Sequence, residues 1–375
     1  MHMDSCRRAL KRVLLPGGLL ALSLSSASGA EETPSDDWAN RLGERIEALE
    51  READGELGVH VRRLSDDSSF DHKGDRLWYL SSTVKIPVAV VVLQQVESGE
   101  LALEDELTLE QSQRIDGAGD LLWQDPGARY SIDNLLERML IDSDNVAADM
   151  LIGTIGIDRL NDRIQEMTQE GFFGDGTFEP LTTLAEVRYA VYSEIHPSAR
   201  DLDREQLIEI AAAPIGPERV DALARTLGVS HDELQTNDMD TAYQRYYDKH
   251  LNSATLVGYS DLLTSLVRGD LLNDEHRELL YRDLKIDSYD AYRLEGGLPR
   301  SVDFIQKTGT QHRRACHMGV IRPNQPDDAI VVTACTAEMD EAGPSERLLE
   351  QVGEAIADTL LSEEASTAST NNEES

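Results

Sequence analysis

The sequence of 375 residues predicts an α/β fold of the α+β type, with one antiparallel sheet flanked by helices and completed by both chain ends. Three observations favour it. A helix-like segment and a strand-like segment come early in the chain, helix-like segments fill the middle, and three strand-like segments and a helix close it. We expect the middle to form a mostly helical lobe, and the functional site to lie where this lobe meets the sheet. The length suits one large domain or two small ones.

The first 30 residues have the pattern of a signal peptide. Basic residues at 7–12 precede a short apolar run, Val13 to Leu24, and the small residues Ser28-Gly29-Ala30 suit cleavage. The run is too short and too glycine-interrupted for a membrane span. No cysteine follows it, so no lipoprotein site is predicted. We therefore predict a signal peptide over residues 1–30 and a secreted, periplasmic protein, with an uncleaved anchor as the alternative.

The net charge is strongly negative along the whole chain. The formal value is −36, and removal of residues 1–30, which carry a net +3, leaves −39. Such a charge argues against nucleic acid or an anionic membrane as a partner. A solvated acidic surface suits a salty environment. This hypothesis about habitat predicts that the protein loses its folded-state signal when it is transferred from high to low salt. A stability that does not depend on salt would contradict it.

The first elements after the signal are a helix and a hairpin. Asp36 to Glu52 has helical spacing, and Leu57 to Leu64 starts as an alternating strand whose hairpin partner is expected at Ser68 to Gly74. His60 falls on the polar phase of that strand, so a structural or exposed role is expected. No His-x-x-x-His or similar spacing occurs, so neither a metal nor another cofactor is predicted.

The central segment runs from Tyr79 to Val88 and contains Ser82 and Lys85. On a helix this spacing places both side chains on one face, one turn apart. A lysine in apolar surroundings has a lowered pKa and can take the proton of a serine hydroxyl. The apolar run Val88 to Leu93 supplies such surroundings. The β-branched residues of this run alone would favour a strand. We nevertheless expect a helix that begins near Ser82 and ends at Gly99.

The middle of the chain contains a glycine-rich loop and many helix-like segments. Gly117 to Gln124 includes Trp123, which is either a wall of the site or a plain packing residue. Ser143-Asp144-Asn145 joins two helices, and alone it is an ordinary turn or cap. The stretch of about 197–252 is predicted to be a polar, helical insertion, followed by a helix over Ser253 to Gly269.

Three strands and a helix are predicted to close the fold. The strands are Val302 to Gln306, Ala315 to Arg322 and Ala329 to Thr336, and the helix is Ser345 to Ser362, before a disordered acidic tail at 363–375. If Ile321 faces Ile330 in an antiparallel hairpin, then Cys316 faces Cys335, which permits a disulfide. Two buried free thiols are the alternative.

Three motifs occur in a fixed order: Ser82-x-x-Lys85, Ser143-Asp144-Asn145 and Lys307-Thr308-Gly309. Together they resemble the signature set of the class A β-lactamase superfamily, the penicillin-recognising serine hydrolases. The resemblance covers about 36–361 apart from the insertion. It implies a β-lactamase/transpeptidase-like fold over 31–362, no cofactor, a monomer, and a small β-lactam or a cell-wall peptide as substrate.

The resemblance also implies a role for each motif residue. Ser82 would be the acylated nucleophile, Lys85 its base, and Ser143 the relay that protonates the departing nitrogen. Asn145 would hold Lys85 and the substrate's amide. Lys307 and Thr308 would bind the substrate carboxylate, Gly309 would allow close approach, and the N–H groups of Ser82 and Thr310 would form the oxyanion hole.

One part of the class A pattern is missing. The motif Glu-x-x-Leu-Asn, whose carboxylate activates the deacylating water in that class, does not occur. Glu179, in Phe178-Glu179-Pro180-Leu181, is the nearest match and our candidate base, and Glu170 and Glu194 are the other acids in the region. The favoured function is a β-lactamase, with a role in antibiotic resistance. The alternatives are a D-Ala-D-Ala carboxypeptidase-like hydrolase and a penicillin-binding protein without turnover.

Overall fold

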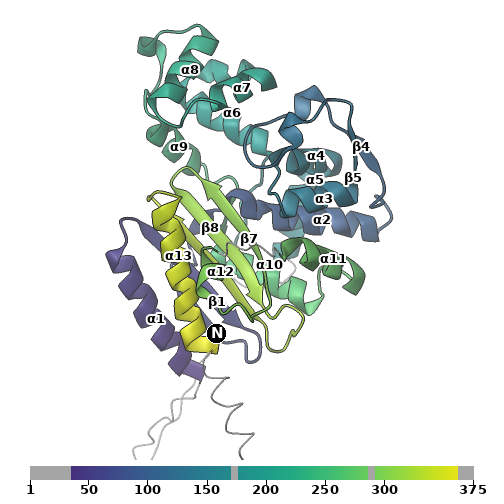
Figure 1. Cartoon of the computed structure of the whole chain (residues 1–375), viewed down its shortest axis with the longest axis vertical. Helices are drawn as coiled ribbons and strands as arrows, with labels where there is room; N and C mark the ends of the chain where they lie inside the picture. The colour runs from purple at the N-terminus through teal and green to yellow at the C-terminus, as the bar shows by residue number, and fades with distance from the viewer. Residues whose placement is uncertain (1–34, 170–175, 286–291, 362–375) are drawn as a thin grey trace, which may run out of the picture. The chain divides into compact units, whose positions relative to one another are not determined.

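The computed structural model describes residues 35–169, 176–285 and 292–361 (Figure 1). The predicted signal peptide, the acidic tail and Glu170 lie outside the described residues. Within those ranges, no helix combines the length and the apolar character that crossing a membrane requires.

The sheet has five antiparallel strands in the order β2-β1-β9-β8-β7. The early part of the chain contributes β1 and its hairpin partner β2, and the late part contributes the other three. Because β1 pairs with β9, the two ends of the chain meet in the sheet, as the sequence predicts. The strands are β1 (Glu56–Arg63), β2 (Ser69–His72), β7 (Phe304–Gln311), β8 (Arg314–Ile321) and β9 (Ile330–Ala337).

Helices cover both faces of this sheet, so β1 is buried on both sides. On one face lie α1 (Ser35–Glu52), α13 (Gly343–Ile356), its extension η6 (Ala357–Leu361) and the short α12 (Leu294–Gly297), around a core that includes Trp38, Leu42 and Val352. On the other lies α10 (Leu256–Arg268) (Figure 1). For His60 the sequence predicts a structural or an exposed role, and the structure shows the structural one. The side chain is buried, and its Nδ1 lies 3.1 Å from Asp71 Oδ1.

The predicted helix over Ser253 to Gly269 begins three residues late. Its first residues form β6 (Ser253–Thr255), which pairs with β3 (Leu77–Tyr79), and the pairing partner could not be seen in the local pattern. The Thr255 side chain then caps α10 by accepting a hydrogen bond from the N–H of Gly258.

A second group of helices surrounds the segment that contains Ser82 and Lys85. The buried helix α2 (Lys85–Glu97) packs against the neighbouring helices of this group. Because α2 is buried on every side, it needs no amphipathic pattern. The other elements are α3 (Ile132–Leu140), α4 (Asn145–Ile155), α5 (Ile157–Gln169), α11 (Asp274–Leu284), η2 (Gln111–Gln113), η3 (Leu121–Trp123), β4 (Glu106–Thr108) and β5 (Arg129–Ser131).

The stretch predicted to be an insertion is helical, as the sequence predicts, and follows α6 (Leu184–Ile195). It consists of η4 (Pro197–Asp201), α7 (Arg204–Ala211), α8 (Pro217–Leu227), η5 (His231–Glu233) and α9 (Met239–Tyr247). These helices gather beside α6, and α9 lies between them and the sheet (Figure 1).

Candidate active site

Ser82 and Lys85 lie at the junction of two helical segments. The turn η1 (Ser81–Val84) is a 3-10 helix, and Lys85 is the first residue of α2. The helix predicted from near Ser82 therefore begins as a tighter, 3-10 turn. Its first residue, Ser81, has a positive φ of 52°. The Lys85 Nζ atom lies 3.1 Å from Ser82 Oγ. The spacing of the motif thus brings the hydroxyl and the amine together, as expected.

The Lys85 amine also contacts the loop before α4. Its Nζ lies 3.1 Å from Ser143 Oγ, 2.9 Å from Asn145 Oδ1 and 2.6 Å from the Ser143 carbonyl oxygen. Burial, followed by the positive charge of Lys307, holds the pKa of Lys85 well below its usual range. A neutral amine has a lone pair, so the hydroxyl of Ser82 can donate its hydrogen bond to Nζ. This geometry suits proton transfer from serine to lysine.

The Ser-Asp-Asn loop is held in place by its own middle residue. Asp144 accepts hydrogen bonds from the N–H of Ala147, which caps α4, and from the N–H of Leu121, both at 2.9 Å. The glycine-rich loop lies against this turn. A Cβ atom at Gly117, where φ is 119°, would lie 2.1 Å from Asn145 Nδ2, so only glycine fits there. Trp123, at the end of the loop, is 73% exposed, so plain packing is not its role.

Strand β7 supplies the third motif from the edge of the sheet. Gly309 faces the nucleophile: a Cβ atom there would lie 2.5 Å from the Leu80 carbonyl oxygen and 3.1 Å from Ser82 N. The Lys307 side chain is buried, and burial, followed by the charge of Arg293, lowers its pKa to about 7. All three motifs therefore come together around Ser82, with Thr310 next to Gly309 on the same strand.

Two residues of this site were missed by the sequence analysis. The buried Arg293 donates hydrogen bonds to the carbonyl oxygens of Gly309 and Cys316, each at 3.0 Å, and to Thr310 Oγ1 at 2.7 Å. The hydroxyl of its neighbour Tyr292 lies 3.1 Å from Thr308 Oγ1. Neither belongs to a motif. The only signal in the sequence is their place just before the closing strands.

Glu179 lies on a short extended segment beside β6. Its N–H donates to the Ser253 carbonyl oxygen at 2.9 Å, and its carboxylate makes no hydrogen bond or ion pair with the residues that the structure describes. Within the same ranges, no carboxylate is hydrogen-bonded to Ser82 or Lys85. The role of Glu179 as deacylation base therefore stays a prediction.

The two late cysteines lie opposite each other in the hairpin of β8 and β9. Ile321 pairs with Ile330 and Cys316 with Cys335, in the register that the sequence predicts, and a disulfide joins the two sulfur atoms. Cys316 also lies opposite Gly309 on β7. Among the described residues, no three His, Cys, Asp or Glu side chains gather as metal ligands.

The match to a protein family covers all three motifs. The model of the "Beta-lactamase enzyme family" matches residues 41–175 and 206–360. The chain belongs to this family. A β-lactamase of Rhodobacter capsulatus is 31% identical over 140 residues, which are 37% of this chain and 46% of that relative. The β-lactamase OXY-2 of Klebsiella oxytoca is 22% identical over 350 residues, 91% of this chain and 95% of the relative.

Solved structures show the same fold at low sequence identity. PBP-A matches with a TM-score of 0.62 and 17% identity, over 86% of this chain and 96% of its own. An ancestral class A β-lactamase matches with a TM-score of 0.61 and 20% identity, over 85% of this chain and 100% of its own. These structures show the shared fold of an antiparallel sheet with flanking helices. Together with the family match, they make the chain a member of the class A β-lactamase and penicillin-recognising serine hydrolase superfamily.

Proposed function

We propose that the protein is a serine β-lactamase that is acylated at Ser82 and then hydrolyses the acyl-enzyme. The observation that carries the proposal is the position of the Lys85 amine, which is buried within 3.1 Å of both serine hydroxyls. The names of relatives add support, since the two described above are both β-lactamases.

Acylation would proceed through the residues around Lys85. Ser82 Oγ attacks the lactam carbonyl carbon while Nζ takes the hydroxyl proton. The N–H groups of Ser82 and Thr310 stabilise the negative charge on the carbonyl oxygen. The C–N bond then breaks, and the proton passes from Lys85 through Ser143 to the ring nitrogen. The product is an ester between the opened ring and Ser82.

The anionic end of the substrate would bind beside β7. Lys307 and Thr308 offer an ammonium and a hydroxyl that match a carboxylate. Arg293 lies behind them and keeps this part of the site positive, because its charge is buried and bound to main-chain oxygens. Hydrolysis of the ester needs a water and a base, and Glu179 is our candidate for that base.

A second function is a D-Ala-D-Ala carboxypeptidase-like or penicillin-binding protein that forms a long-lived acyl-enzyme. A specific observation favours it: within the described residues, no carboxylate is hydrogen-bonded to Ser82 or Lys85. The fold match to PBP-A fits this alternative as well. We further propose that the mature protein is a secreted, periplasmic monomer that starts after residue 30.

A time course with a chromogenic cephalosporin separates the two functions. Many turnovers per molecule, with little adduct in intact-mass spectra, are the result expected of a β-lactamase. A single burst of product followed by a stable adduct on Ser82 would contradict the proposal that the acyl-enzyme is hydrolysed. The second function, a penicillin-binding protein with a long-lived acyl-enzyme, would then remain. A parallel assay with a D-Ala-D-Ala peptide measures the carboxypeptidase activity directly.

A further inference from the structure

The peptide unit that joins Gly309 to Thr310 lies on β7, the edge strand of the sheet. Its N–H group, which belongs to Thr310, is one of the two donors proposed for the oxyanion hole. The other donor is the N–H of Ser82, and a Cβ atom on Gly309 would lie 3.1 Å from that nitrogen. Ser82 therefore lies directly beside this peptide unit.

The carbonyl group of the same peptide unit is bound by Arg293. Its Nη1 donates to the carbonyl oxygens of Gly309 and Cys316, which are opposite each other on β7 and β8. Because one nitrogen reaches both oxygens, the Gly309 carbonyl points toward β8. The C=O and N–H groups of a trans peptide point in opposite directions, so the Thr310 N–H points away from β8, to the open edge of the sheet.

The charge of Arg293 is directed at this peptide unit. The side chain is 2% exposed, and it forms no ion pair with the residues that the structure describes. Another of its hydrogen bonds goes to Thr310 Oγ1 at 2.7 Å. A hydrogen bond from a cation to a peptide carbonyl draws electron density toward the oxygen, and the N–H of that peptide becomes a stronger donor.

The backbone at Arg293 has an unusual conformation. Its φ of 56° and ψ of −138° are rare for a residue with a Cβ atom, and such values persist only where neighbouring contacts impose them. The next residue, Leu294, donates its N–H to His317 Nδ1 at 3.2 Å. It also packs closely on α13, where a Cβ atom at Gly353 would lie 2.2 Å from the Leu294 carbonyl oxygen. These contacts fix the segment that begins with Arg293.

His317 is suited to its contact because it is neutral. The side chain is fully buried, and burial, followed by the charges of Arg293 and Lys307, holds the pKa of His317 well below its usual range. A neutral imidazole has one acceptor nitrogen, and here it is Nδ1, because that atom faces the N–H of Leu294. A protonated ring would leave this N–H without its acceptor.

We propose that Arg293, held in place by His317, tunes the oxyanion hole by orienting and polarising the peptide unit between Gly309 and Thr310. Both are positioning residues, since they act through this peptide unit and do not touch the reacting atoms. The inference rests on the proposed acylation at Ser82. It differs from a role in carboxylate binding, because the oxyanion hole serves every substrate with a reacting carbonyl group, with or without a carboxylate.

The first test compares a penicillin with its own methyl ester. The rate constant for acylation of Ser82 is measured with both substrates for the unmodified protein and for Arg293→Lys, which keeps the positive charge but loses the planar fork of donors. We expect about a tenfold loss with each substrate, less than the loss of roughly 100- to 1000-fold for removal of an oxyanion donor. A loss with the acid alone would assign Arg293 to carboxylate binding and overturn the inference.

The infrared spectrum of the acyl-enzyme reports on the oxyanion hole itself. Strong hydrogen bonds weaken the C=O bond of the ester and lower the frequency of its stretching band, which an isotopic label at the lactam carbonyl carbon identifies. Arg293→Lys should shift this band to higher frequency, because the Thr310 N–H becomes a weaker donor. Slower acylation with an unshifted band is the result expected of a merely structural role, and it would also overturn the inference.

Two variants of His317 test its part without a change at Arg293. His317→Leu removes the acceptor for the Leu294 N–H and should reproduce the slower acylation and the band shift. The side-chain oxygen of an asparagine can replace Nδ1 as the acceptor, so His317→Asn should stay within about threefold of the unmodified protein. Equal losses in the two variants would contradict the role assigned to His317.

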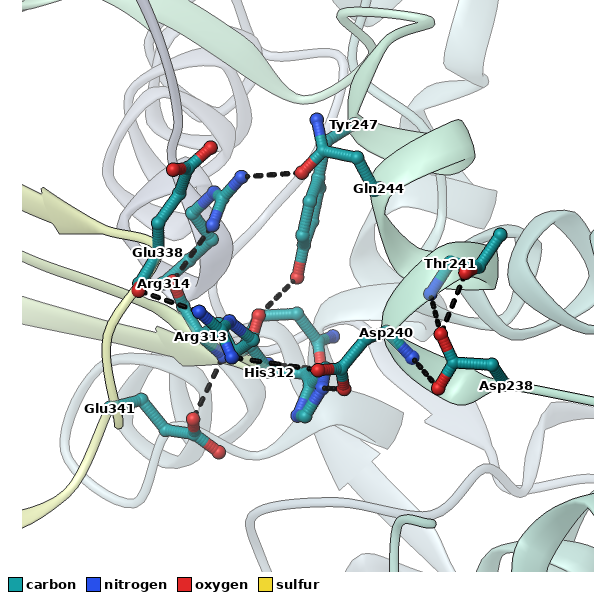
Figure 2. A network of polar contacts seen from close by, with 11 residues as sticks. Asp238, Asp240, Thr241, Gln244, Tyr247, His312, Arg313, Arg314, Glu338 and Glu341 are labelled. Carbon is teal, nitrogen blue, oxygen red and sulfur yellow. Dashed lines mark hydrogen bonds and ion pairs between the residues drawn. The ribbon is translucent and has the colours of Figure 1, made fainter. Parts of the chain in front are cut away.

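Arg314→Lys is the matched control for a buried arginine on the sheet. Arg314 lies on β8, as His317 does, and it is 9% exposed. Its guanidinium donates to the Arg313 carbonyl oxygen at 2.9 Å and to Gln244 Oε1 at 3.1 Å. Figure 2 shows these contacts, with the guanidinium over the Tyr247 ring.

This control variant should leave both acylation rate constants and the band unchanged, because none of its contacts is with the oxyanion peptide unit. A band shift in Arg314→Lys equal to that in Arg293→Lys would overturn the inference. Failure of the unmodified protein to be acylated by either substrate would instead contradict the proposed function.

Discussion

Lys307 lowers the pKa of Lys85 across the site. Burial of the Lys85 amine is the main cause, and the positive charge of Lys307 adds to it. The two lysines come from different parts of the fold, one from the start of α2 and one from β7. Their proposed roles require different charges, because Lys85 must be neutral to accept a proton and Lys307 must be charged to bind a carboxylate.

This relationship predicts how acylation depends on pH. Because the pKa of Lys307 is lowered to about 7, its ammonium is lost as the pH rises through that value. The acylation rate constant of a penicillin with a free carboxylate should therefore fall above about pH 7, and at acidic pH it should fall again as Lys85 becomes protonated. The methyl ester of the same penicillin is the control and should lack the alkaline decrease. An equal alkaline decrease for acid and ester would contradict the role of Lys307.

Tyr292→Phe should weaken binding of the substrate carboxylate. The change removes the hydroxyl that lies 3.1 Å from Thr308 Oγ1 and keeps the ring. We expect KM for a carboxylate-bearing β-lactam to rise by about three- to tenfold, with kcat nearly unchanged, as for loss of one hydrogen bond. Tyr130→Phe, on β5, is the control for a tyrosine hydroxyl outside the site. A fall in kcat without a change in KM would count against this placement of Tyr292.

Glu179→Gln tests the candidate deacylation base. If Glu179 activates the water, the variant should still be acylated at Ser82 but should turn over about 100-fold more slowly and accumulate the acyl-enzyme, as for loss of a general base. Glu194→Gln is the matched control, because Glu194 is paired with Lys249 at 2.5 Å. Unchanged turnover in Glu179→Gln would assign deacylation to another group.

Removal of the disulfide should lower stability more than activity. The bond closes a loop with a sequence separation of 19 residues, so the double variant Cys316→Ala/Cys335→Ala should lose about 2–4 kcal/mol in free energy of unfolding. Urea unfolding with and without reductant measures this loss, and reductant should have no effect on the variant. Two titratable thiols in the unfolded, unreduced protein would show that the bond does not form.

The motif residues could be singled out from the sequence because three short motifs occur together in the order that the family resemblance requires. Ser82 and Lys85 are one turn apart, and Ser143, Asn145 and Lys307 sit in short motifs with a fixed order. The register of the β8–β9 hairpin was only a condition at the level of the sequence: Cys316 faces Cys335 if Ile321 faces Ile330, and the structure has that register.

The residues that support the motifs could not be predicted in this way. Arg293 becomes recognisable only when its guanidinium is seen against the carbonyl oxygens of β7 and β8. Arg188 and Asp116 are 72 residues apart and look like ordinary surface charges in the sequence. The predicted start of α10 was wrong for the same reason, because β6 forms only by pairing with the distant β3.

The most direct test of the central claim is the intact mass of the protein after brief reaction with a penicillin and quenching in acid. Ring opening leaves the departing nitrogen attached, so acylation should add the mass of one whole penicillin, and peptide mapping should place it on Ser82. The Ser82→Ala variant should gain no mass. An adduct that persists in Ser82→Ala, or the absence of both adduct and turnover in the unmodified protein, would contradict acylation at Ser82.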